Sequence, residues 1–152
     1  MYDMIDQPVR SLNRGGRLLV GAMRHWVKAA GMGRCPCGDI GAAFQAHGLM
    51  PCLPHFNMMM AVLNREALTP LRFGAVSCGQ VSEHEALLIG LLRTISRMQP
   101  QAAKDTMAMI VVPEAAGTLL IALTAMGQGL AYAGLTPAHA LHDPECNRFP
   151  HE

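Results

Sequence analysis

Apolar residues recur at helical spacing along most of this 152-residue chain. The first such stretch, residues 16–30, predicts an amphipathic helix with a basic outer side, ended by a pair of glycines. Its apolar positions are Leu18, Leu19, Ala22, Met23, Trp26 and Ala30. Its basic positions are Arg17, Arg24 and Lys28, which we predict to form an exposed interaction surface.

A capping box marks the clearest helix start. Ser82 and Glu85 can satisfy the free backbone N–H groups of a helix that then runs to about residue 98, before Pro100. The apolar side chains that follow fall on one stripe. They are Leu88, Leu91, Leu92, Ile95 and Met98.

Four further helices are expected from caps and breakers. They cover residues 39–47, capped by Asp39 and ended by Gly48; 54–67, starting near Pro54; 101–111; and 114–133, between Pro113 and Gly134. Residues 69–76 alternate instead, which indicates a short extended piece. The fold class is therefore all-α, an irregular bundle of five or six helices that allows one short extended segment near 70–77.

The chain length suits a single domain. We expect a flexible basic N-terminal arm at 1–15, one helical domain at 16–135, and a C-terminal tail at 136–152. Met1 to Pro8 carry Asp3 and Asp6 and do not resemble a secretion signal, so we expect a cytoplasmic protein with its five cysteines as thiols.

Hydrophobic residues make up 51% of the chain and charged residues only 15%, which favours self-association as a homodimer or with a protein partner. Residues 115–135 are just long enough to cross a bilayer. Glycine, threonine and glutamine dilute this stretch and no cluster of Lys or Arg flanks it, so we expect a buried helix and not a membrane span. Its small-residue ridge of Ala125, Gly129 and Ala133 predicts a closely packed neighbouring helix.

Positive charge is concentrated in residues 1–34, where six Arg or Lys residues face only Asp3 and Asp6. A basic helix and arm could contact nucleic acid, an anionic membrane surface or an acidic partner, and a solvated basic face is the simpler interpretation. Residues 39–63 also have the outline of a helix-turn-helix with Gly48 in the turn. The second helix offers His55 and Asn57 but no Arg or Lys before Arg65, so binding to nucleic acid is not expected.

Two sets of cysteine and histidine residues could hold a metal. Cys35, Cys37, Cys52 and His55 form C-x-C followed by C-x-x-H, a ligand set for tetrahedral zinc. The simpler interpretation is that Cys52 is a buried small hydrophobe and that the other two thiols lie in a loop, with redox chemistry as a third alternative. The second set lies in the tail: His139, His142, Cys146 and His151.

Two further features are candidates for function. Cys78 precedes the capping-box helix and could be a reactive thiol activated by His84, although Glu83 and Glu85 oppose this and an ordinary loop cysteine is the simpler interpretation. Met58, Met59 and Met60 are consecutive and span about 200° of a helix, so they cannot all share one core stripe. We interpret the three methionines mainly as core residues, and predict that at least one of them contacts a neighbouring helix or a partner.

The apolar pattern at 17–26, the pair of helices separated by Gly48, and the C-x-x-x-S-x-x-E-x-L-L pattern at 78–88 resemble a small family of uncharacterised proteobacterial hypothetical proteins. The resemblance covers roughly residues 17–92 and rests mostly on packing positions. It implies a bacterial, cytoplasmic helical domain. That family has no known activity, so the resemblance implies no catalytic residue.

No G-x-S-x-G motif and no suitable acidic pair is present, so no enzyme is indicated. Our leading hypothesis is a non-enzymatic helical interaction or regulatory domain. The second is a zinc-binding or thiol-redox module, and the third is a DNA-binding regulator. No cofactor is expected, with zinc as the one candidate.

Overall fold

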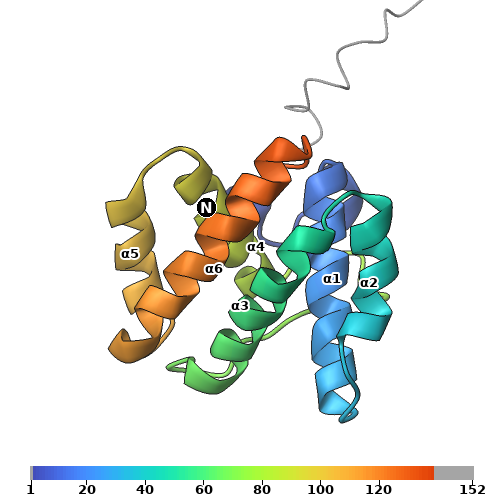
Figure 1. Cartoon of the computed structure of the whole chain (residues 1–152), viewed down its shortest axis with the longest axis horizontal. Helices are drawn as coiled ribbons and strands as arrows, with labels where there is room; N and C mark the ends of the chain where they lie inside the picture. The colour runs from blue at the N-terminus through green and yellow to red at the C-terminus, as the bar shows by residue number, and fades with distance from the viewer. Residues whose placement is uncertain (1, 139–152) are drawn as a thin grey trace, which may run out of the picture.

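A computed structural model describes residues 2–138 and contains six α-helices in that range (Figure 1). They are α1 (Arg14–Gly31), α2 (Cys37–Ala46), α3 (Leu53–Glu66), α4 (Glu83–Ser96), α5 (Pro100–Ala108) and α6 (Pro113–Tyr132). Short 3-10 turns occupy Tyr2–Met4, Val9–Ser11 and Met50–Cys52. The described residues form no strand, and the expected all-α class is confirmed.

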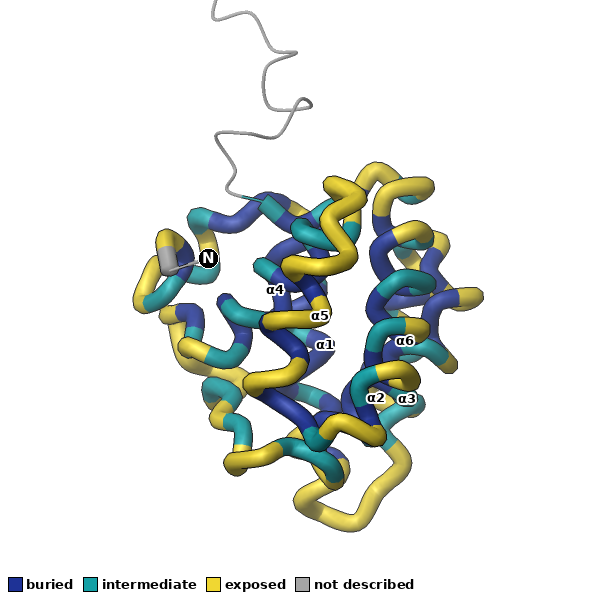
Figure 2. The backbone as a smooth tube through the Cα atoms, turned by 90° about the vertical axis from the view of Figure 1, so that its left-hand side faces the viewer, coloured by how far each residue is buried: buried dark blue, intermediate teal, exposed yellow. Residues whose placement is uncertain are grey.

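Helices α3 and α6 lie side by side at the front of the molecule, with α5 on one side and α1 and α2 on the other (Figure 1). The end of α3 lies beside the start of α6, because the Val112 N–H donates to the Glu66 carbonyl at 3.0 Å. The two helices are therefore antiparallel. Helix α4 lies behind α6 and is largely buried, whereas the outer turns of α5 are exposed (Figure 2).

The helix boundaries follow the predicted signals closely. The Ser82 capping box is present in both directions, and Gly48 and Gly134 end their helices at φ values of 70° and 71°. Helix α1 begins two residues earlier than expected because the Asn13 side chain accepts the Gly16 N–H at 2.9 Å.

Two boundary predictions are wrong. Asp39 does not cap α2, because Pro36 already has helical angles and α2 begins at Cys37; Asp39 instead pairs with Arg34 at 3.3 Å. Met98 does not continue the core stripe of α4. The helix ends at Ser96 because Pro100 disfavours helical angles at the preceding residue, and Met98 takes φ 56° with 88% of its surface exposed.

The segment expected to be extended, residues 69–76, forms no strand because no neighbouring segment pairs with it. It is held against the start of α4 by other bonds. The Arg72 N–H donates to His84 Nδ1 at 2.7 Å, and the Gly74 N–H donates to Glu85 Oε1 at 2.9 Å. The segment thus covers one end of α4 as an irregular strap.

Residues 2–13, which we expected to form a flexible arm, lie against the helical body. Met4 and Leu12 are buried in the core. The Asp6 N–H donates to the Val81 carbonyl at 3.0 Å, and the Val81 N–H donates to the Gln7 carbonyl at 2.9 Å. Burial of apolar side chains and these paired backbone groups explain why this part of the chain packs.

At Gly129, the middle residue of the small-residue ridge, α6 packs closely against Cys52 in the turn before α3. A Cβ atom at Gly129 would overlap Cys52 Sγ, which occupies the space that the missing side chain leaves. The buried Cys52 thiol, whose pKa is raised by burial, therefore acts as a packing group at this contact.

We expect Gly129→Ala to destabilise the protein by about 1–3 kcal/mol, because the new methyl group overlaps Cys52 Sγ. In a Cys52→Ala background the same change should be nearly neutral, since Cys52 Cβ would lie 3.7 Å away, an ordinary contact. Urea unfolding of the two single variants and the double variant measures this coupling. Simple additivity of the two changes would show that the contact is absent.

Candidate functional site

The outer side of α6 carries no charged group after its first turn. Residues 115–138 contain no Asp, Glu, Lys or Arg, and neither do residues 40–64, which include most of α3. Because α3 and α6 are neighbours, these two stretches form one surface. We define the α3–α6 face by the outward residues Pro54, Met58, Ala61, Gly117, Ile121, Ala125, Gln128 and Tyr132.

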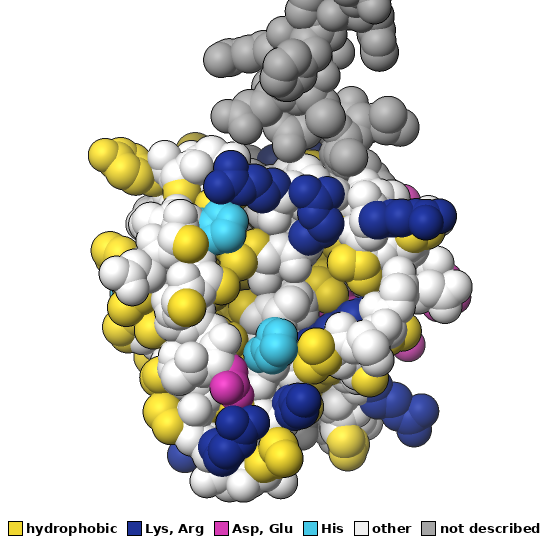
Figure 3. All heavy atoms as spheres, turned by 90° about the vertical axis from the view of Figure 1, so that its right-hand side faces the viewer, with side chains coloured by type: hydrophobic (Ala, Val, Ile, Leu, Met, Phe, Trp, Pro, Cys, Tyr) yellow, Lys and Arg dark blue, Asp and Glu magenta, His cyan; other side chains and the backbone are white. Residues whose placement is uncertain are grey.

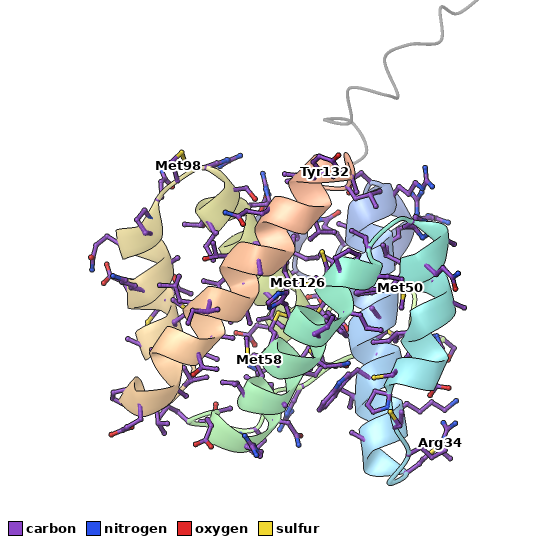
Figure 4. All side chains as sticks on the ribbon, viewed as in Figure 1. Arg34, Met50, Met58, Met98, Met126 and Tyr132 are labelled. Carbon is purple, nitrogen blue, oxygen red and sulfur yellow. The ribbon has the colours of Figure 1, made fainter. Side chains whose placement is uncertain are left out.

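Large apolar side chains project from this face. Ile121 is 63% exposed and Tyr132 is 97% exposed. Met58, labelled on α3 in Figure 4, is half-buried against the core. Solvent-exposed helix sides normally carry charged residues, so an uncharged side with projecting Ile and Tyr side chains is typical of a contact surface.

An apolar groove of about 510 Å³ adjoins this face, between α6 and the corner that joins α4 to α5. We call it the α6 groove. Its lining contains no charged residue and comprises Ile95, Ser96, Met98, Pro100, Leu120, Thr124, Gly127, Gln128 and Ala131. Met98 and Tyr132 lie at the same end of the molecule (Figure 4). The groove therefore extends the uncharged surface and offers space for side chains of a partner.

Two of the three consecutive methionines lie in the core, in line with our main interpretation of them. Met59 and Met60 are buried in the core, so they are not interaction residues. The reason is that α3 is covered on two sides, by α6 and by α2. Met58 alone of the three faces outward. The residues that the sequence analysis missed are Ile121, Tyr132 and the groove.

Charged residues lie at one end of the α3–α6 face. Arg65 at the end of α3 and Glu114 at the start of α6 are exposed and line one small cavity with Thr118. Neither forms an ion pair within 4 Å with any residue from 2 to 138. The uncharged face thus has one positive group, Arg65, and two negative groups, Glu66 and Glu114, at the same end.

The predicted basic surface is wrong at Arg24. Arg17 and Lys28 are exposed, but Arg24 is only 4% exposed and points into the protein. Its Nε and Nη2 atoms donate to the two oxygens of Glu85 at 2.8 and 3.0 Å. Its other donors reach the carbonyls of Cys78 and Gln80. A buried carboxylate 61 residues away thus turns this arginine inward.

Burial raises the pKa of the Glu85 carboxyl, but the Arg24 guanidinium and the backbone N–H groups of Ser82 and Gly74 outweigh it and hold the pKa below its ordinary value. Because the two side chains satisfy each other and the surrounding backbone, the pair is structural. Several Lys and Arg side chains are spread over the side formed by α1 and α2 (Figure 3).

The proposed zinc ligands are not brought together. Cys52 packs against α6, Cys35 is exposed, and Cys37 Sγ accepts a hydrogen bond from Asn57 Nδ2 at 3.0 Å. Within the part of the chain that the structure describes, no three His, Cys, Asp or Glu side chains are placed to hold a metal. His139, His142, Cys146 and His151 lie outside the described residues.

Cys78 is exposed in the loop between the strap and α4, and its Sγ lies 3.6 Å from the Gln80 carbonyl. The His84 Nδ1 accepts the Arg72 N–H, so that nitrogen is already bonded. The reactive thiol remains a prediction.

The helix-turn-helix interpretation also remains a prediction. Asn57, one of two side chains that could read a base, is turned toward α2 by its bond to Cys37.

Helix α6 is the one described helix long and apolar enough to cross a membrane, although 39% of that stretch is buried inside the protein.

The chain has no significant match among protein-family models, curated proteins or solved structures.

Proposed function

We propose that this chain is a non-enzymatic protein-interaction domain that binds a partner through the α3–α6 face and the α6 groove. The observation that carries the proposal is the absence of charge from residues 40–64 and 115–138, which the fold joins into one surface. A long uncharged helix side with the projecting side chains of Ile121 and Tyr132 is more typical of a contact surface than of a side that meets only water.

Burial of such side chains would drive association. Covering one exposed large aliphatic side chain contributes roughly 1.5–3 kcal/mol. The α6 groove could accept apolar side chains from a helix that lies across it, which is a common mode of peptide recognition. Gln128 and Thr124 carry uncharged hydrogen-bonding groups, which could fix the orientation of a bound helix.

The proposal is tested by a photo-crosslinking residue, benzoyl-phenylalanine, placed at position 121 in the organism that makes the protein. We expect a discrete crosslinked species of defined mass. The matched control is position 32, because Met32 is 64% exposed and Ile121 63%, and Met32 lies at the end of α1, away from the face.

A second substitution establishes that the crosslink reports the face. Met58→Glu should abolish the species formed from position 121, since it places a charge on the α3 side of the same surface. Absence of a discrete species, or equal labelling from positions 121 and 32, would contradict an interaction through this face.

A further inference from the structure

We infer that the partner on the α3–α6 face is a second copy of this chain, related by a twofold axis parallel to α6, so that α3 of each copy packs on α6 of the other. This inference rests on the proposed function and specifies its partner. Its arguments are the size of the face, its charge pattern and the antiparallel arrangement of the two helices.

The face has the size that a stable dimer needs. Helix α6 has 20 residues and α3 has 14. At 1.5 Å per residue they are about 30 and 21 Å long, and neighbouring helices lie about 8–10 Å apart. The projected area is then on the order of 500 Å², before the added surface of projecting side chains and the groove. A standard interface buries about 800 Å² of accessible surface per partner, so this face with its groove is of the right magnitude.

The lack of charge permits self-association. In a twofold interface, a charged group close to the axis lies near its own copy, and like charges across an interface oppose binding. Residues 40–64 and 115–138 contain none, so a copy of this face meets no repulsion over most of its area.

The charged residues at this end of the face favour one orientation of the twofold axis. In a twofold arrangement with the axis parallel to α6, the end of α3 in one copy lies on the start of α6 in the other. Arg65 of each copy then faces Glu114 of the second copy, which gives two opposite-charge contacts. With the axis perpendicular to α6, Arg65 would instead face the uncharged end of α3 near Met50.

An anionic membrane fits this surface less well. Helices that bind such membranes combine an apolar side with flanking Lys and Arg residues. No Lys or Arg lies in either uncharged stretch, and Arg65 at the end of α3 is accompanied by Glu66 and Glu114.

The test uses two charge reversals, each of which produces like-charge contacts in its own homodimer. We expect the dimer dissociation constant of R65E and of E114R to rise by about tenfold relative to the unmodified chain. A mixture of the two variants should form the R65E–E114R heterodimer with close to the original affinity, because both contacts in it are attractive. Sedimentation velocity and native mass spectrometry of differently tagged chains measure this. Charges within one chain cannot produce such rescue in a mixture.

Ile121→Glu should abolish the dimer, with a dissociation constant raised more than about a hundredfold by two buried carboxylates, and Met32→Glu should leave it unchanged. A monomeric wild-type chain at 100 μM would overturn the inference. A mixture of R65E and E114R that dimerises no more tightly than either variant alone would overturn it as well. If the wild-type chain binds vesicles of anionic lipid and forms no dimer, the inference is also overturned. If the crosslinked species from position 121 does not have twice the chain mass, the proposed function survives and the second copy does not.

Discussion

Replacing Gly15 with alanine is expected to destabilise the protein by more than about 3 kcal/mol, since overpacking against rigid backbone exceeds the usual cost of an added methyl group. A Cβ atom at this position would overlap the backbone oxygen of Leu135 and lie 2.6 Å from its carbonyl carbon. A flexible side chain could move away from such a contact, but a backbone carbonyl cannot do so without shifting its segment.

The segment in question is held by several bonds. Asn13 Nδ2 donates to the Thr136 carbonyl at 2.8 Å, the Ala138 N–H donates to Asn13 Oδ1 at 3.0 Å, and the Leu135 N–H donates to the Leu130 carbonyl at 2.7 Å. A methyl group at Gly15 must therefore separate the start of α1 from the end of α6 and break this network.

Gly21 in the same helix provides the matched control. No atom lies within 4 Å of the position that a Cβ atom would take there, so Gly21→Ala should stabilise the protein by about 0.5–1 kcal/mol through helix propensity. Chemical unfolding monitored by circular dichroism compares the two variants. Similar unfolding free energies for Gly15→Ala and Gly21→Ala would show that the contact with Leu135 does not exist in solution.

Removing one member of the Arg24 and Glu85 pair is expected to reduce the unfolding free energy by about 3–5 kcal/mol. Arg24→Met leaves a buried carboxylate without its guanidinium donors, and Glu85→Leu leaves a buried guanidinium. Each single change exposes the other charge to an apolar interior, where solvation is poor. The pair connects α1, α4 and the strap, so the loss affects the whole domain.

The double variant Arg24→Met with Glu85→Leu should be more stable than either single variant, because no unpaired charge remains. Equal or additive losses would contradict a buried, mutually dependent pair. The comparison also separates the pair from the exposed basic residues. Lys28→Met, on the outer side of the same helix, should change stability by less than about 0.5 kcal/mol.

The same carboxylate makes stability depend on pH. Because the pKa of Glu85 is lowered in the folded protein, the unfolded chain binds protons more readily than the folded one in acid. The stabilisation is complete above the ordinary carboxyl pKa of about 4.3 and is lost as pH falls through the lower folded value. Glu85→Gln should flatten the acid dependence of the unfolding free energy relative to the unmodified chain. An unchanged acid profile would contradict this assignment.

Local sequence signals predicted the helices because each signal acts within a few residues. The Ser82 and Glu85 capping box, Pro113 at the start of α6 and the glycines at 48 and 134 all act through nearby backbone groups. The ridge at Gly129 was also visible, since a missing side chain permits close approach whichever helix supplies the neighbour.

The sequence by itself therefore determined the all-α class, the helix order and the low charge of two long stretches. Only the tertiary structure decided what these features mean. It turned Arg24 inward, because its partner Glu85 lies 61 residues away on another helix and no local period reveals such a pairing. It buried Met59 and Met60, and by setting α3 beside α6 it joined two separate uncharged stretches into one face. Helical periodicity shows which side of a helix is apolar, but contacts between helices decide which sides remain open to a partner.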